Sequence, residues 1–119
     1  MHATNATGDS TFTVIDIPAR ISPDLLESYK NKYLHFIREY GADYVLNMEK
    51  VEHLFSTTLA LIMHIFNAVI LLNGSLSMVN VSKQVAVAMR FMKIDEKIPV
   101  FSSVEDYEFE RLTAAPLHA

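Results

Sequence analysis

The sequence predicts an α/β domain: a mixed, mostly parallel sheet of four or five strands, with about four helices. Short β-branched runs alternate along the chain with longer segments of helical periodicity, an order typical of parallel strands joined by right-handed crossovers. The chain has 119 residues, which is the size of one domain. Its residues are 50% hydrophobic and 20% charged, as in an ordinary globular protein with one core.

The domain itself should span residues 12–112. Residues 1–11 are small and polar, and residues 113–119 follow the last predicted helix, so we expect a flexible leader and a flexible tail there. The first strand is predicted over Phe12–Ile17, which is rich in β-branched residues and alternates in part. Pro18 limits its continuation.

The first helix should begin at Ser22. Its hydroxyl can accept a hydrogen bond as an N-cap, Pro23 suits the first helical position, and Asp24 favours the positive end of the helix dipole. Apolar side chains then recur along one stripe as far as Tyr40. Gly41 is typical of the residue that follows a helix, so we expect the helix to end there.

The second and third strands flank the most apolar helix of the chain. Asp43–Met48 and Ser75–Val81 have strand character, and Ser56–Asn73 between them is apolar nearly all round and ends at Gly74. A membrane span needs about 20 predominantly apolar residues. The best uninterrupted run, Leu59–Leu72, is shorter and contains a histidine and an asparagine. We therefore interpret it as a buried helix and expect no membrane insertion.

The last part of the sequence predicts a helix, a short strand and a final helix. Ser82 begins the third helix, and Ile98–Phe101 is a strand that Pro99 places at an edge of the sheet. Ser102 and Glu105 have the spacing of a capping box, so the final helix should start with them.

Composition and motifs exclude several classes of function. The formal net charge of −4 argues against a non-specific nucleic-acid binder. The chain has no cysteine and its start lacks a secretory signal, which is compatible with a cytoplasmic protein. Glycine-rich phosphate loops, a nucleophile elbow and histidine pairs at metal-binding spacing are all missing from the sequence. We therefore expect no cofactor, no metal and no enzymatic activity.

Three hydroxyl side chains stand together at the predicted start of the apolar helix, in the segment Leu54–Leu59. One interpretation is structural, with Ser56 as the N-cap. The other is regulatory, with Ser56, Thr57 or Thr58 as a phosphoacceptor. A phosphate would be tolerated by the helix dipole, yet it would add up to about two negative charges to a contact surface. The residues by themselves leave both interpretations open.

Two helices carry more apolar residues than a single core stripe needs. Leu61 and Ile65 lie off the main stripe of the second helix, and Val87, Phe91 and Ile94 form a second stripe on the third. If helices cover only one face of the sheet, both stripes meet solvent and mark a protein partner. Otherwise they are buried in the fold or in a homodimer. The candidate partner-contact residues are His53, Phe55, Leu61, Ile65, Val87 and Phe91.

The order of elements and several motifs together resemble the STAS domain, the fold of bacterial anti-sigma factor antagonists. The resemblance extends from Phe12 to Glu110. The family's segment Val-x-x-hydrophobic-Asp-Ser-Ser-Gly-Leu, which leads into an apolar helix, matches Val51–Leu59. Its closing Pro-Val-Phe strand followed by Ser-Val-Glu matches Pro99–Glu105. Further matching stretches are FTVIDIPARIS, YVLNMEKV and SLSMVNVSKQVAVAMRFM.

The resemblance implies a mechanism. Family members bind an anti-sigma factor that is also a serine kinase, which frees the sigma factor for transcription. The kinase inactivates the antagonist by phosphorylating a serine that corresponds to Ser56, and a PP2C-type phosphatase restores it. This chain has Phe55 where the family has aspartate, and Thr58 where it has glycine. The alternative role is a non-switching STAS scaffold or accessory subunit of a stress-signalling or transport assembly.

Overall fold

A computed structural model describes residues 2–5, 11–39 and 41–114. Within these residues one five-stranded sheet has the strand order β1-β2-β3-β4-β5. Strand β1 is antiparallel to β2, and β2 to β5 run parallel to one another, so the predicted mixed, mostly parallel sheet is confirmed. The strands are β1 (His2–Asn5), β2 (Thr11–Asp16), β3 (Asp43–Asn47), β4 (Ser75–Val79) and β5 (Val100–Phe101).

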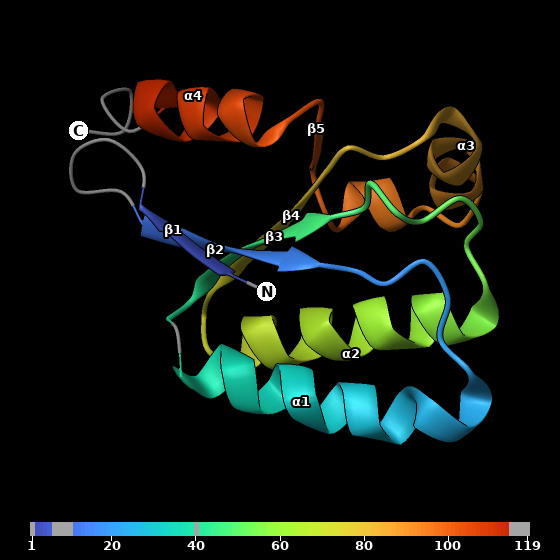
Figure 1. Ribbon diagram of the computed structural model, residues 1–119. Helices are drawn as coiled ribbons and strands as arrows, with labels where there is room; N and C mark the ends of the chain where they lie inside the picture. The colour runs from blue at the N-terminus through green and yellow to red at the C-terminus, as the bar shows by residue number, and fades with distance from the viewer. Residues whose placement is uncertain (1, 6–10, 40, 115–119) are drawn as a thin grey trace.

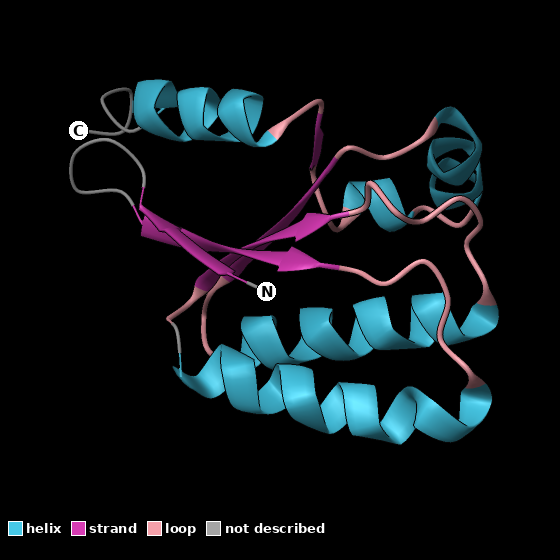
Figure 2. Ribbon diagram, in the orientation of Figure 1, coloured by secondary structure: helices cyan, strands magenta, loops and turns pink. Residues whose placement is uncertain are grey.

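Helices cover both faces of the sheet (Figure 1). Helices α1 and α2 lie side by side on one face, α4 crosses the other, and α3 lies toward the side where the parallel strands end (Figures 1 and 2). No helix in the described part of the chain has the length and apolar character needed to cross a bilayer. The bounds are α1 (Leu26–Glu39), α2 (Ser56–Leu71), α3 (Lys83–Phe91) and α4 (Val104–Ala114), with short 3-10 turns at Pro23–Leu25 and Ile94–Glu96.

Alternation along the strands divides the buried side chains between two cores. The larger core lies under α1 and α2 and takes residues such as Ile15 and Leu46. The smaller lies under α4, where the Tyr107 ring packs edge-on against Phe12, with 4.9 Å between the ring centroids. Because successive strand residues point to opposite faces and both faces are covered, consecutive residues of β3 and β4 are buried, among them the polar Ser77.

One hydrogen-bonded ion pair fastens α4 to the sheet. Arg111 Nη2 lies 2.8 Å from Asp43 Oδ2, and Ser75 Oγ donates to Asp43 Oδ1 at 2.8 Å. Burial by itself would raise the pKa of Asp43, but the hydrogen bonds from Arg111 and Ser75 and the guanidinium charge outweigh it and hold that pKa below its usual value. This contact sets the position of the last helix.

Residues 2–5 are not part of the flexible leader that the sequence had led us to expect. They form β1, in which His2 pairs with Val14 and Asn5 with Thr11. A short polar segment carries no strand signal of its own, and its pairing comes from the open edge of β2. Residues 1 and 6–10 of the expected leader, and residues 115–119 of the expected tail, lie outside the described residues. Helix α4 extends into the expected tail, to Ala114.

Of the N-caps predicted at Ser22, Ser82 and Ser102, only the one at Ser82 is present. Ser82 caps α3, because its Oγ accepts a hydrogen bond from the Val85 amide at 3.2 Å. Helix α4 is capped by Ser103 rather than by Ser102, with a backbone N–H of the first turn 3.1 Å from its Oγ. Ser22 precedes a 3-10 turn, and its side chain makes no capping bond. Such shifts of one or two residues are usual at helix ends.

Candidate partner-binding site

The candidate site lies where the parallel strands end and α2 begins. Polar side chains at the ends of three neighbouring strands are joined there: Asn47 Nδ2 donates to Asp16 Oδ1 at 2.9 Å, and Asn80 Nδ2 donates to Asn47 Oδ1 at 3.0 Å. The Glu49 amide also donates to Asn47 Oδ1, at 3.2 Å. These bonds fix the start of the loop that leads to α2. These bonds were not predicted from the sequence, although Asp16, Asn47 and Asn80 each directly follow the apolar residues of a strand.

Helix α2 begins at Ser56, but Ser56 is not its cap. The N-cap is Phe55, with extended backbone (φ −72°, ψ 161°), and its carbonyl accepts the Leu59 amide at 2.9 Å. The prediction of a capping Ser56 was therefore wrong by one residue, since the helix starts one position earlier than the hydroxyl pattern indicates. The Ser56 side chain is exposed, and its hydroxyl bonds to none of the residues that the structure describes.

The two threonines after Ser56 differ from it and from each other. Thr57 is half-buried, and its Oγ1 donates to the Ile21 carbonyl at 2.8 Å, which ties α2 to the loop after β2. Thr58 is fully buried, and its Oγ1 finds no hydrogen-bond partner within the described ranges. Only Ser56 thus combines an exposed side chain with an unengaged hydroxyl.

Opposite effects on stability are expected for Thr57→Val and Thr58→Val. Thr57→Val removes a made hydrogen bond and should lower the free energy of unfolding by about 1 kcal/mol. Thr58→Val removes a buried, unpaired hydroxyl at nearly constant volume and should raise that free energy by about 1 kcal/mol. Urea denaturation of both variants measures the difference. Destabilisation by Thr58→Val would contradict the absence of a partner for its hydroxyl.

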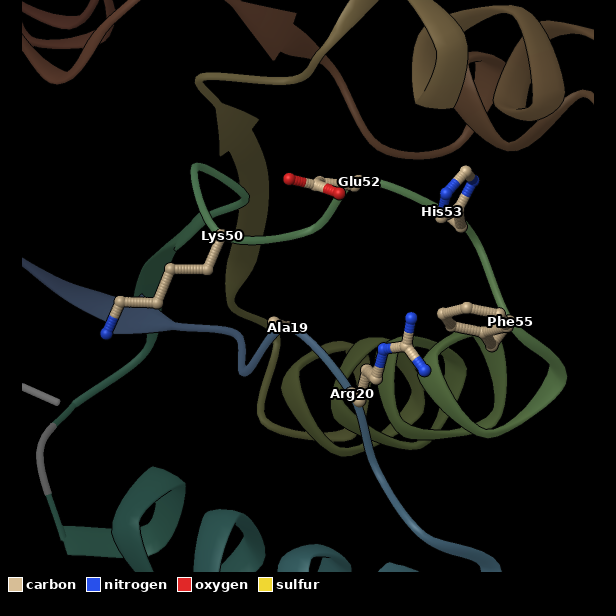
Figure 3. Close-up of a pocket in the computed structure, with 6 residues that line it drawn as sticks. All are labelled: Ala19, Arg20, Lys50, Glu52, His53 and Phe55. Carbon is tan, nitrogen blue, oxygen red and sulfur yellow. The ribbon is translucent and has the colours of Figure 1, made fainter.

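An aromatic cluster, formed by Arg20, His53 and Phe55, borders Ser56. The Arg20 guanidinium carbon is 5.4 Å from the centroid of the Phe55 ring, and the His53 ring is 5.7 Å from it at 60°. Gln84 Nε2 lies 3.1 Å from His53 Nδ1 and links the cluster to α3. The cluster lines a hollow of about 170 Å³ together with Lys50, whose side chain points away from the other residues (Figure 3).

The predicted apolar contacts divide into exposed and buried pairs. On α3, Val87 is 61% and Phe91 89% exposed, so for these two residues the solvent-exposed alternative holds. Leu61 and Ile65 on α2 are both fully buried, so the alternative that this stripe is buried in the fold holds, and listing these two residues as partner contacts was wrong. The reason is that α2 packs against both the sheet and α1, so both of its apolar stripes are covered. Ile94, expected on the exposed stripe of the third helix, is also buried.

The candidate site gathers groups of three different kinds. It combines an exposed serine and a cation held on an aromatic ring with the start of α3, a helix that carries an exposed phenylalanine at its other end. Among the described residues no three histidine or carboxylate side chains gather as a metal site would require.

Fold and site together define a class: a small α/β domain in which an exposed serine begins the helix that follows a central parallel strand. A family model for the STAS domain matches residues 5–107, and the chain belongs to this family. No curated protein sequence matches the chain.

Three solved structures illustrate the shared fold. RsbS of Moorella thermoacetica, in a serine-to-glutamate variant, aligns with a TM-score of 0.74 at 15% identity, covering 94% of this chain and 99% of that one. An anti-sigma-factor antagonist (STAS) domain protein of Planctomyces limnophilus aligns at 0.70 with 21% identity and coverages of 91% and 94%. A sulfate transporter family protein of Wolinella succinogenes aligns at 0.67 with 16% identity, covering 80% of each chain.

Proposed function

We propose that this protein is an anti-sigma factor antagonist that binds an anti-sigma serine kinase, and that phosphorylation of Ser56 releases the kinase. The observation that carries the proposal is the exposed, unbonded hydroxyl of Ser56 at the start of α2, bordered by the aromatic cluster. Membership of the STAS family and the likeness to an anti-sigma-factor antagonist domain support the general kind of function.

Ser56 is the proposed acceptor because a kinase must reach the hydroxyl. Thr58 is buried, and Thr57 is half-buried with its hydroxyl engaged by the Ile21 carbonyl. In the proposed reaction the γ-phosphoryl group of ATP passes to Ser56 Oγ, ADP leaves, and the hydroxyl proton is taken up by the kinase. A PP2C-type phosphatase would hydrolyse the same ester and return the free serine.

The proposed contact surface extends from α2 to α3. His53 and Phe55 lie beside Ser56, and Val87 and Phe91 present exposed apolar groups on α3. The bond from Gln84 to His53 holds the two parts together. Aromatic side chains in a central position often dominate the energetics of such interfaces. A phosphate on Ser56 adds up to about two negative charges at this surface, and their desolvation and repulsion would oppose binding.

The proposal is tested by comparing wild type with Ser56→Asp and Ser56→Ala. The three proteins are used to capture partners from a lysate of the source organism, and the retained kinase is then titrated against each. Ser56→Asp should bind about tenfold more weakly or worse, which corresponds to a loss of about 1.4 kcal/mol or more. Ser56→Ala, the matched control, should bind like wild type. Circular dichroism verifies that both variants fold. Equal affinity of Ser56→Asp and wild type for the kinase would refute the switch.

A non-switching scaffold or accessory subunit is the second candidate. Two observations favour it: Phe55 and Thr58 depart from the family's aspartate and glycine, and Phe91 is exposed on α3 whatever the state of Ser56. For such a protein the same partner should be retained equally by wild type and Ser56→Asp, while Phe91→Ala should weaken the complex.

A further inference from the structure

We infer that the hollow between Arg20 and Ser56 is a binding site for a phosphate monoester, in which Arg20 leaves the Phe55 ring and pairs with the phosphate of phosphorylated Ser56. The inference rests on the proposed function for the origin of the phosphate. It adds Arg20 as the residue that binds the phosphate and that exchanges the Phe55 ring for it.

Among the residues that the structure describes, Arg20 is the only charged one in the lining of this hollow. The hollow has a volume of about 320 Å³, and its wall includes Arg20, Ser22, Phe55, Ser56 and Thr57. The serine that would carry the phosphate and the guanidinium that would bind it therefore share one space. The first turn of α2 contains no acidic residue, so the positive end of its dipole adds to the same field.

The Arg20 guanidinium is available for a new partner. It is exposed and forms no ion pair with any described residue, and its recorded contact is with the Phe55 ring at 5.4 Å. A cation–π contact at an exposed site is weak. A guanidinium–phosphate pair is charge-assisted and can be bidentate. Arg20 should therefore bind a phosphate within its reach in preference to the Phe55 ring.

Neighbouring charges favour phosphate binding in the hollow that contains Ser56 over binding in the hollow that contains Glu52. Glu52 and Lys50 line this second hollow, of about 170 Å³, which shares Arg20 and Phe55 with the first, and Figure 3 shows both side chains apart from the Arg20 guanidinium. A phosphate there would meet the Glu52 carboxylate, whereas no described residue contributes a carboxylate to the wall of the hollow beside Ser56. The residue at position 55 matters for the same reason. A carboxylate there would bind Arg20 and repel the phosphate, and the phenyl ring of Phe55 does neither.

The test places phosphoserine at position 56 by genetic encoding and follows its second ionisation by phosphorus NMR. The pKa of the phosphate should be about 0.2–0.7 unit higher in Arg20→Gln than in wild type, because a nearby cation favours the dianion. Arg20→Lys should lie between them. The matched control is Arg38→Gln, since Arg38 is also an exposed arginine but lies near Leu71 and Leu72 at the opposite end of α2. The pKa in this control should equal that of wild type.

Two further measurements test the inference. In the wild-type phosphoprotein the Nε–Hε signal of Arg20 should titrate together with the phosphate, and the pKa difference from Arg20→Gln should shrink in high salt. The same pKa in wild type and Arg20→Gln would overturn the inference, and so would an equal shift in Arg38→Gln. The experiment uses neither kinase nor partner. Its failure therefore leaves the proposed switch standing, and failure of the switch leaves this result unaffected.

Discussion

Leu61→Ala is expected to lower the free energy of unfolding by about 2–5 kcal/mol. The Leu61 side chain is fully buried in the larger core, on the side of α2 for which the sequence allowed exposure. Truncation removes apolar contacts and leaves a cavity that close packing cannot refill. Urea denaturation, with the slope compared between proteins, measures this loss.

Phe91→Ala is the matched control for Leu61→Ala. The Phe91 side chain is 89% exposed on α3, so its truncation should change the free energy of unfolding by less than about 0.5 kcal/mol. The two variants therefore separate core residues from contact residues, and any loss of partner binding in Phe91→Ala is a direct effect. A stable Leu61→Ala protein together with an unstable Phe91→Ala protein would show that the helices are rotated differently.

Gly74→Ala is expected to destabilise the protein by about 3 kcal/mol or more, at the upper end for an overpacked site. A methyl group at position 74 would overlap the carbonyl oxygen of Ala42 and press on Val69 Cγ1 at 3.0 Å. The same carbonyl accepts the Ser75 amide at 3.0 Å, so it cannot move without breaking the entry to β4. Thermal unfolding should show a clearly lower midpoint.

Gly41→Ala distinguishes this steric effect from backbone strain. Gly41 has φ +107°, but nothing lies within 4 Å of the position a methyl group would take. Its replacement should cost about 1–3 kcal/mol, from the left-handed conformation alone. At the end of α2 that conformation belongs to Asn73, with φ 56°, so the glycine at position 74 serves close approach instead. A Gly74→Ala protein as stable as wild type would contradict the packing of this turn.

The sequence was a good guide to the order and type of the elements. Strands β2 to β5 and helices α1 to α4 were all predicted, because short strand-forming runs and helical stripes of period 3.6 are local patterns. Strand β1 was not predicted, since its polar residues gain strand structure only by pairing with β2. Pro99 correctly indicated that its strand lies at the edge of the sheet.

The periodicity of apolar residues could not predict which face of α2 is buried. The helix is apolar nearly all round, so no single stripe defines its inner face. Leu61 and Ile65 are buried because α1 and the sheet cover two sides of the helix at once. The second stripe predicted on the third helix is itself divided, because Phe91 is exposed whereas Ile94 is buried, and the sequence had left both outcomes open.

The sequence by itself determined the fold class and the place of the hydroxyl cluster at the start of an apolar helix. Only the tertiary structure decided which hydroxyl is accessible and what surrounds it. Thr58 and Ser56 differ by burial, and Arg20 meets Phe55 across two loops that follow different strands. The physical reason is that secondary structure follows from local side-chain patterns. Accessibility and the meeting of distant charges and rings depend instead on how the helices pack on both faces of the sheet.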